Sequence, residues 1–305
     1  MKRMLLHVLH ETAYDYSPMV RTAQHMAHLK PATTPHQQLL SHRLVVDPRP
    51  AQQTEAVDVY GNTRSFFSLS YVHDGLRVQA ESLVSTTPRE RPADSLPWDA
   101  AVERMRYHRA ALYDAAAEFA FSSPYVPRDA AFVEYAQGSF TEGRPLLDAA
   151  EDLMRRIHAD FEYATTATDV NTPALQALRL RKGVCQDLAH VMLGCLRSLC
   201  LPARYVSGYL LTEPPPGQPR LVGSDASHAW VSVYLPAAQG PGQWYDLDPT
   251  NDRAAGEDYV TLAYGRDYAD VSPIRGVIHG GTNHSLRVAV TVTPAEAAAP
   301  QVAAP

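Results

Sequence analysis

The sequence predicts an α+β protein in which strands and helices occupy separate parts of the chain. Residues 1–86 contain short β-branched and aromatic stretches separated by turn residues. Residues 145–161 repeat apolar positions at helical spacing, and alternating strands return after residue 203. The chain has 305 residues, which is enough for about two domains.

The N-terminal part, residues 1–86, is predicted to be a small β domain. Strands are expected in "RLVVDP" (43–48), "RSFFSLSYV" (64–72) and "LRVQAESLVS" (76–85), which alternate or run apolar. The segment 87–98 that follows is rich in proline and charge, so we expect a linker there.

The segment 99–275 is expected to form the α+β core. Within it, "PLLDAAEDLMRRIHADF" predicts an amphipathic helix, because its apolar residues fall on one stripe. The residues of that stripe are Leu146, Ala150, Leu153 and Ile157. Strands are then expected at 203–211, 228–235 and 243–248. We expect 276–294 to supply a strand that rejoins the N-terminal sheet, and 295–305 to be a disordered tail.

All three cysteines lie in "RKGVCQDLAHVMLGCLRSLCLPARYVSGYL", residues 181–210. From Leu188 the apolar residues cover nearly every side of a helix, which predicts a buried central helix packed on the sheet. Cys195 and Cys200 are therefore expected to be small core residues. Cys185 follows Gly183-Val184 at the first helical turn, where the helix dipole and free N–H groups favour a thiolate. It is either a nucleophile or a structural thiol at a helix start.

A thiolate nucleophile requires a base, and the strands near 228–248 offer one. In "SDASHAWVSVYLP" His228 and Trp230 share one face, and in "GQWYDLDPTND" Asp246 and Asp248 share one face. A turn centred near Ala238 would make these strands a hairpin in which His228 faces Asp248 and Trp230 faces Asp246. A slip of two residues would instead place Asp246 opposite His228, so the strand period leaves both aspartates open.

Composition excludes several classes of protein. A net charge of −6 argues against a nucleic-acid partner, because phosphate binding requires a basic surface. No apolar run approaches the roughly 18 residues of a membrane span. The start "MKRMLLHVLHETAYDY" makes a poor signal peptide, and three cysteines do not form a disulfide framework, so we expect a cytoplasmic protein. The pair His25 and His28 has no carboxylate or thiol beside it in sequence, so we expect no metal site.

The stretches "GVCQDLAHVMLGCLRSLCLPARYVSGYL", "DASHAWVSVYLP" and "WYDLDPTN" resemble, in this order, the three catalytic blocks of the bacterial transglutaminase-like superfamily. "HETAYDYSPMV" (10–20) and "DVYGN" (58–62) resemble the β-rich domain that precedes the core in the bacterial branch, and "GRDYADVSP" (265–273) resembles a stretch that follows it. The resemblance implies a papain-like core with a Cys-His-Asp triad and no cofactor. By motif position Cys185 is the nucleophile, His228 the base and Asp248 the orienting acid.

Four further residues border the expected site and are candidates for substrate binding. They are Gln186, Asp187, Tyr209 and Trp230. Asp187 most simply caps the helix, and Tyr209 and Trp230 are either structural aromatics or cleft walls. His190, five residues beyond Cys185, is expected to be a hydrogen-bonded core histidine.

The resemblance implies thiol chemistry on a peptide or protein amide. Animal transglutaminases, which resemble the same pattern, carry tryptophan directly after the nucleophile, whereas this chain carries Gln186. No calcium-loop signature is present. We therefore expect a cysteine hydrolase that cleaves an amide through a thioester. Acyl transfer to an amine and a non-catalytic peptide-binding module are the alternatives, and the sequence predicts no oligomeric state.

Overall fold

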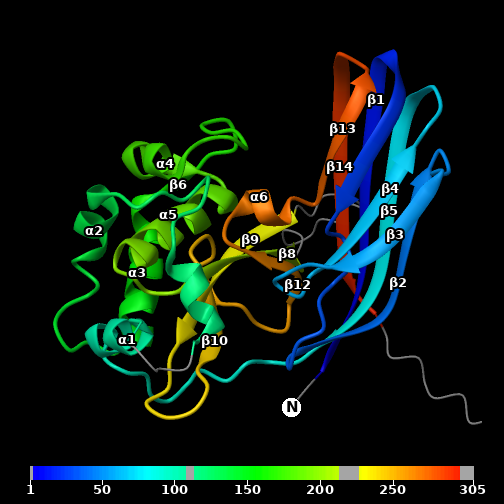
Figure 1. Cartoon of the computed structure of the whole chain (residues 1–305). Coiled ribbons are helices and arrows are strands. Elements are labelled where there is room, and N and C mark those ends of the chain that lie inside the picture. The colour runs from blue at the N-terminus through cyan, green and yellow to red at the C-terminus, as the bar shows by residue number, and fades with distance from the viewer. Residues whose placement is uncertain (1–2, 108–112, 213–226, 296–305) are drawn as a thin grey trace, which may run out of the picture.

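The computed structural model describes residues 3–107, 113–212 and 227–295. Two lobes lie side by side in Figure 1: a mainly helical lobe with its own sheet, and a tall antiparallel sheet. Both the class and the order of the parts agree with the α+β prediction. Of the expected tail, residues 296–305 lie outside the described residues. No helix in the described ranges is long and apolar enough to cross a membrane.

Seven strands form the N-terminal sheet. They are β1 (Met4–Ala27), β2 (Gln37–Asp47), β3 (Gln52–Val57), β4 (Thr63–Leu69), β5 (His73–Thr86), β13 (Ile274–Gly280) and β14 (Asn283–Pro294). Five of them run in the order β2-β5-β1-β4-β3, and β13 and β14 both pair with β1. The segment 276–294, expected to supply a strand to this sheet, contains part of β13 and all of β14. The register of β14 with β1 runs from Ser17↔Asn283 to Leu6↔Pro294.

The longest strand of this sheet, β1, was not expected from the sequence. Its inward positions alternate as a strand requires, but they include His10 and Thr12 as well as Leu6 and Val8. Both polar side chains are buried, and they hydrogen bond to each other, His10 Nε2 to Thr12 Oγ1, at 2.9 Å. Because His10 and Thr12 interrupt the apolar face directly after Leu6 and Val8, hydrophobic alternation alone does not reveal the strand.

The helical lobe contains the remaining elements. The helices are α1 (Trp98–Met105), a 3₁₀ helix η1 (Ala115–Ala120), α2 (Ala130–Ala136), α3 (Leu146–Asp160), α4 (Ala174–Leu180), α5 (Cys185–Ser198) and α6 (Tyr268–Val271). The strands are β6 (Glu162–Tyr163), β7 (Lys182–Gly183), β8 (Ala203–Leu210), β9 (Ser227–Leu235), β10 (Gln243–Asp248), β11 (Arg253–Ala254) and β12 (Tyr259–Gly265). Five of these strands form an antiparallel sheet in the order β11-β10-β9-β8-β12.

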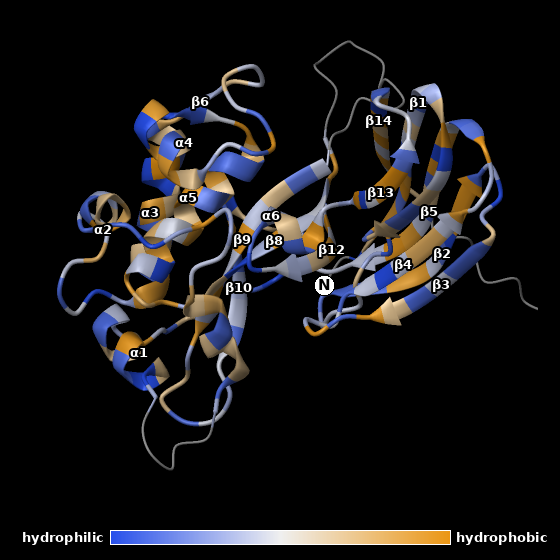
Figure 2. Ribbon diagram, turned by 45° about the horizontal axis from the view of Figure 1, so that its top comes forward, coloured by the Kyte–Doolittle hydropathy of each residue, from blue (hydrophilic) through white to orange (hydrophobic). Residues whose placement is uncertain are grey.

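Helix α5 is the buried centre of this lobe, as predicted. It contacts β8 and β9 on one side and α2, α3 and α4 on the other. The predicted stripe of α3 is fully buried at Leu146, Ala150, Leu153 and Ile157, which confirms the amphipathic helix. Figure 2 shows the resulting pattern, with hydrophilic and hydrophobic residues alternating along helices and strands of both lobes.

The C-terminus of α5 corrects the expectation for Cys200. Cys195 is fully buried as predicted, but Cys200 is exposed. The helix ends in a Schellman motif, because the Leu201 N–H donates to the Leu196 carbonyl at 3.0 Å and the Cys200 N–H to the Arg197 carbonyl at 3.0 Å. Cys200 therefore occupies the left-handed position that glycine usually fills, with φ of 63°.

The two lobes share a packed and hydrogen-bonded boundary. Leu6 and Val8 of β1 belong to the same hydrophobic core as α5. Asn62 bonds both backbone groups of Tyr264, donating to its carbonyl at 2.7 Å and accepting from its N–H at 2.8 Å. Gln37 bonds both backbone groups of Thr261 in the same way. The β lobe therefore fixes β12, the edge strand of the five-stranded sheet in the helical lobe.

Candidate active site

The site begins at the N-terminus of α5, where Cys185 is half-buried. The Val184 N–H and the Thr168 hydroxyl donate to Asp187 Oδ2 at 2.8 Å and 2.6 Å, so Asp187 caps the helix. Gly183 leaves room for this cap, because a Cβ there would lie 2.6 Å from the Asp187 carboxylate. The short run from Gly183 to Asp187 thus presents the thiol at a capped helix start.

His228 lies at the beginning of β9 and is held by Asp248 at the end of β10. His228 Nε2 and Asp248 Oδ2 are 2.7 Å apart, and the His228 side chain is 10% exposed. Burial acts to lower the pKa of His228, but hydrogen bonds to Asp248 and Cys185 outweigh it and raise that pKa to about 10. With Nε2 bonded to the acid, Nδ1 is the ring nitrogen left for the Cys185 thiol.

Asp248 is completely buried and fully hydrogen bonded. Besides His228, its Oδ2 accepts from the Tyr259 hydroxyl at 2.8 Å and from Asn251 Nδ2 at 2.7 Å, and its Oδ1 accepts from the Thr250 N–H at 2.8 Å. Burial acts to raise the pKa of Asp248, but these donors together lower it. The acid is therefore ionised beside the imidazole.

The predicted hairpin register is wrong by two residues. In the structure Asp246 pairs with Ser232 and Leu247 with Val231, which places Asp248 opposite Trp230 instead of His228. His228 reaches Asp248 diagonally, as neighbours two positions apart on one face of a sheet can do. The slip is opposite in direction to the one considered from the sequence, and Asp246 lies farther from His228, not nearer.

The four candidate substrate-binding residues differ in burial and in hydrogen-bond partners. Asp187 is 1% exposed and used by the helix cap. Gln186 is half-buried and donates from Nε2 to the Val170 carbonyl at 3.0 Å, which ties the loop before α4 to the residue next to Cys185. Of the four, only Gln186 has surface at the site.

The two candidate aromatics are corrected to packing roles, because neither has surface to offer a substrate. Tyr209 is 1% exposed, and its hydroxyl lies 2.8 Å from His10 Nδ1 of the other lobe. Trp230 is fully buried, and its indole N–H donates to Asp246 at 3.2 Å.

Three residues near the triad were missed from the sequence. Tyr163 pairs with Gly183 in the parallel β6–β7 ladder and is 55% exposed. Because Gly183 is two residues before Cys185, this pairing places Tyr163 beside the site. Burial and the charges of Cys185, Asp187 and Asp248 raise the pKa of its phenol. Asn251 and Tyr259 both donate to Asp248. Asn251 is the last residue of the motif "WYDLDPTN", so its position three residues after Asp248 could have identified it as a hydrogen-bond donor to that acid. No motif marks Tyr163 or Tyr259.

His190 has the core role expected of it. The ring is fully buried, and Nε2 accepts from the Tyr268 N–H at 3.2 Å. Burial lowers the pKa of His190 to about 3, so the ring is neutral. Within residues 3–107, 113–212 and 227–295, no group of three His, Cys, Asp or Glu side chains is arranged to hold a metal ion.

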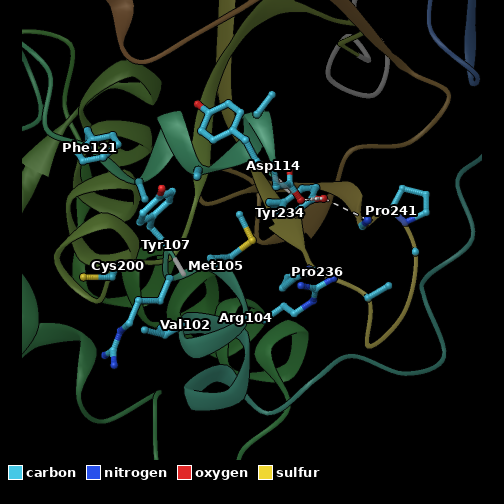
Figure 3. A pocket seen from close by; sticks show the side chains of 18 of the residues that line it. Val102, Arg104, Met105, Tyr107, Asp114, Phe121, Cys200, Tyr234, Pro236 and Pro241 are labelled. Carbon is cyan, nitrogen blue, oxygen red and sulfur yellow. Dashed lines mark hydrogen bonds between the residues drawn. The ribbon is translucent and has the colours of Figure 1, made fainter. Parts of the chain in front are cut away.

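A large cavity lies away from the triad, at the other end of α5. It has a volume of about 1020 Å³ and is lined by α1, η1 and the β9–β10 turn. Figure 3 shows Met105, Phe121 and Cys200 on its wall, and Tyr234, whose hydroxyl donates to Asp114 at 2.5 Å. Because α5 rises about 1.5 Å per residue, Cys200 lies roughly 20 Å from Cys185, so this cavity is not part of the triad site.

Comparisons with known proteins cover both lobes. Residues 6–85 match the model of the bacterial transglutaminase-like N-terminal region, and residues 133–249 match the model of the transglutaminase-like superfamily. Uncharacterized protein Rv2569c of Mycobacterium tuberculosis (strain H37Rv) is 39% identical over 300 residues, which cover 95% of this chain and 92% of that protein. Uncharacterized protein ML0607 of Mycobacterium leprae is 30% identical over 294 residues, 94% of this chain and 98% of that protein.

A solved structure shares the whole fold. The crystal structure of a candidate cysteine protease from Cytophaga hutchinsonii superposes with a TM-score of 0.74 at 20% sequence identity. The match covers 98% of this chain and 93% of that one. The arrangement of β lobe and helical lobe is therefore common to both proteins.

Proposed function

Because this chain belongs to the transglutaminase-like superfamily, with the bacterial N-terminal region, we propose that it is a cysteine hydrolase of peptide or protein amides. The observation that supports this best is the 2.7 Å bond from His228 to buried Asp248, with the Cys185 thiol on the same imidazole. Three unpaired cysteines favour the cytoplasmic location expected from the sequence.

In the proposed mechanism the Cys185 thiolate attacks the amide carbonyl carbon, and a C–S bond forms. The Cys185 N–H, free at the first turn of α5, donates to the developing oxyanion. The His228 imidazolium gives its proton to the leaving nitrogen as the C–N bond breaks. Water then attacks the thioester and His228 takes its proton. The C–S bond breaks, which releases the acid product and restores the thiolate–imidazolium pair. Asp248 fixes the tautomer of the imidazole throughout.

Water is the proposed acyl acceptor. Gln186, directly after the nucleophile, is an amide rather than an indole, and its side chain is tied to the Val170 carbonyl. The alternative is transfer to an amine, which shares the thioester and differs only in what reaches it. We expect hydrolysis to dominate at millimolar amine concentration.

A single assay separates these two outcomes. The protein is incubated with a pool of glutamine-containing peptides and a dansylated primary amine, and ammonia, cleaved peptide and fluorescent adduct are followed together. Hydrolysis products in excess of adduct support the proposal, and adduct in excess would establish acyl transfer. Neither product, with Cys185 still reactive, would favour a peptide-binding module.

The triad assignment has its own test. Asp248→Asn keeps the size of the side chain but supports the wrong imidazole tautomer, so we expect a loss in kcat of about 10⁴, as in serine proteases. Asp148→Asn, on the exposed surface of α3, is the matched control and should retain activity. Equal activity of the two variants would contradict the assignment.

A further inference from the structure

A second buried acid lies on the same face of β10 as the triad acid. Asp246 is two residues before Asp248 and is 1% exposed. Its Oδ2 is 2.7 Å from Arg89 Nη1 and accepts from Trp230 Nε1 at 3.2 Å. A cationic partner stabilises a carboxylate at this depth, because a buried charge is otherwise costly.

Trp230 connects Asp246 with the triad. Its ring packs edge-on to Tyr259 at 5.2 Å and 79°, and lies 6.0 Å from the ring of His228. Tyr259 in turn donates to Asp248 at 2.8 Å. Gly208 closes the other side, because a Cβ there would lie 2.4 Å from the Trp230 ring. The indole is therefore held in one position, with its N–H donated to Asp246.

Arg89 comes from outside the catalytic core. It lies in the segment 87–97 that joins β5 to α1, and its side chain is only 16% exposed. Two other basic groups face Asp246. Arg204 lies between the rings of Trp244 and Tyr264, at 4.2 Å and 3.5 Å, and His36, the residue before β2, lies nearby. Of the three, Arg89 is the one in direct contact with the Asp246 carboxylate.

We propose that Arg89 is a positioning residue of the active site. By pairing with Asp246, Arg89 fixes Trp230 behind His228 and Tyr259. Arg89 also neutralises the charge of Asp246, so that Asp248 supplies the negative charge at the imidazole. The segment between β5 and α1 therefore contributes a positioning residue to the active site. This inference rests on the proposed function, since it requires the thiol–imidazole pair to be the reactive centre.

If Arg89 and Asp246 balance each other, removing either charge should shift the pH dependence of thiolate formation at Cys185, and the two shifts should have opposite signs. The groups that face the His228 ring are Asp248, Cys185, Asn251 and the rings of Trp230 and Tyr259. A unit charge at roughly 10 Å in a partly buried site moves a titration by about half to one pH unit. Removing the positive charge of Arg89 should disfavour the thiolate, and removing the negative charge of Asp246 should favour it.

The experiment measures the rate of iodoacetamide alkylation of Cys185 against pH, by mass spectrometry of the Cys185 peptide in full-length protein. We expect Arg89→Met to move the midpoint up by about half to one pH unit and Asp246→Asn to move it down by a similar amount. The double variant R89M/D246N should return close to wild type. Arg89→Lys, which keeps the charge, should restore most of the profile.

The control is Arg91→Met, two residues along the same segment. Arg91 pairs with Asp148 and Glu151 on the surface of α3, at 2.5 Å and 2.8 Å, away from Asp246. It should leave the alkylation profile unchanged. A purely structural role for Arg89 would lower stability in R89M without a sign reversal in D246N.

Two results would overturn the inference, for different reasons. If wild-type Cys185 is reactive at neutral pH but neither R89M nor D246N moves its profile, Arg89 is not a positioning residue and the proposed function stands. If wild-type Cys185 is inert and no amide is cleaved, the proposed function fails and the inference fails with it. If R89M does not fold, the inference is still tested by two variants: D246N should move the Cys185 alkylation midpoint down, and R89M/D246N should return it close to the wild-type value.

Discussion

At the scale of single residues, two thiols of α5 and one just beyond its C-terminus have three different environments. Cys185 is at the capped N-terminus beside His228, Cys195 is fully buried, and Cys200 is exposed at the C-terminus. Burial raises the pKa of the Cys195 thiol. The sequence distinguished the first two, because helical spacing reports which side chains face the core. It did not separate Cys200, because the last residue of an apolar run can lie in the helix or just beyond it.

These environments predict which thiols react. Native protein treated with iodoacetamide at neutral pH should be labelled at Cys185 fast, at Cys200 more slowly and at Cys195 only after unfolding, because the thiolate fraction and access set the rate. Peptide mapping by mass spectrometry over a time course measures all three. Labelling of Cys195 as fast as Cys185 would contradict the assignment of the buried and reactive thiols.

Cys200 also predicts a stabilising change. Cys200→Gly removes the side chain from a position with φ of 63°, so the left-handed cap should form with less strain. We expect the free energy of unfolding to rise by up to about 1 kcal/mol, since the entropy of glycine in the unfolded chain offsets part of the gain. Urea unfolding measures this, with Cys200→Ala as the control, which removes the sulfur but keeps the Cβ. An equal gain in both variants would mean that the thiol, not the backbone, is responsible.

At the scale of elements, the β9–β10 hairpin shows what periodicity predicts and what it leaves open. Alternation correctly assigned His228 and Trp230 to one face and Val231 and Val233, which join the α5 core, to the other. It could not fix the pairing register, because a shift of two residues preserves the faces of both strands. The turn and the packing of Trp230 against its neighbours set the register that the structure has.

The packing around Trp230 predicts a position that cannot carry a side chain. Gly208, opposite His228 in β8, would place a Cβ 2.2 Å from the Val260 carbonyl and 2.4 Å from the Trp230 ring. We expect Gly208→Ala to destabilise the fold by about 3 kcal/mol or more, because backbone and a fully buried ring must both move. Gly75→Ala in β5, whose Cβ meets only the Tyr14 carbonyl at 3.3 Å, is the control. Similar thermal midpoints for the two variants would show that Trp230 is free to shift.

At the scale of the whole molecule, the sequence predicted the two parts and their order but not their junction. Residue patterns predict each element separately. β1 was not predicted, because polar residues interrupt its buried face. The contacts that join the lobes, such as His10 with Tyr209 and Arg89 with Asp246, link residues far apart in the chain. The local sequence around either partner does not indicate such a pair, because the contact forms only when the folded chain brings the two residues together.

The buried histidines of this molecule predict that acid destabilises it. Burial lowers the pKa of His10 and of His25 to about 4, against about 6.5 in the unfolded chain. Because the unfolded state binds protons that the folded state does not, the free energy of unfolding should fall as pH drops from about 6.5 to 4. Each of the two can account for up to about 3 kcal/mol. His228, whose pKa is raised to about 10, acts oppositely: its contribution is complete below pH 6.5 and is lost as pH rises through 10.

His10 allows this effect to be isolated at the junction of the lobes. His10→Asn keeps an acceptor near the Tyr209 hydroxyl but cannot titrate, so its free energy of unfolding should fall less steeply below pH 6.5 than that of wild type. His279→Asn, at an exposed histidine of β13, is the matched control and should keep the wild-type slope. Urea unfolding at half-unit steps from pH 4 to 7 measures the slopes. The same slope in all three proteins would mean that His10 does not resist protonation, and that the lobes are held together without a neutral imidazole between them.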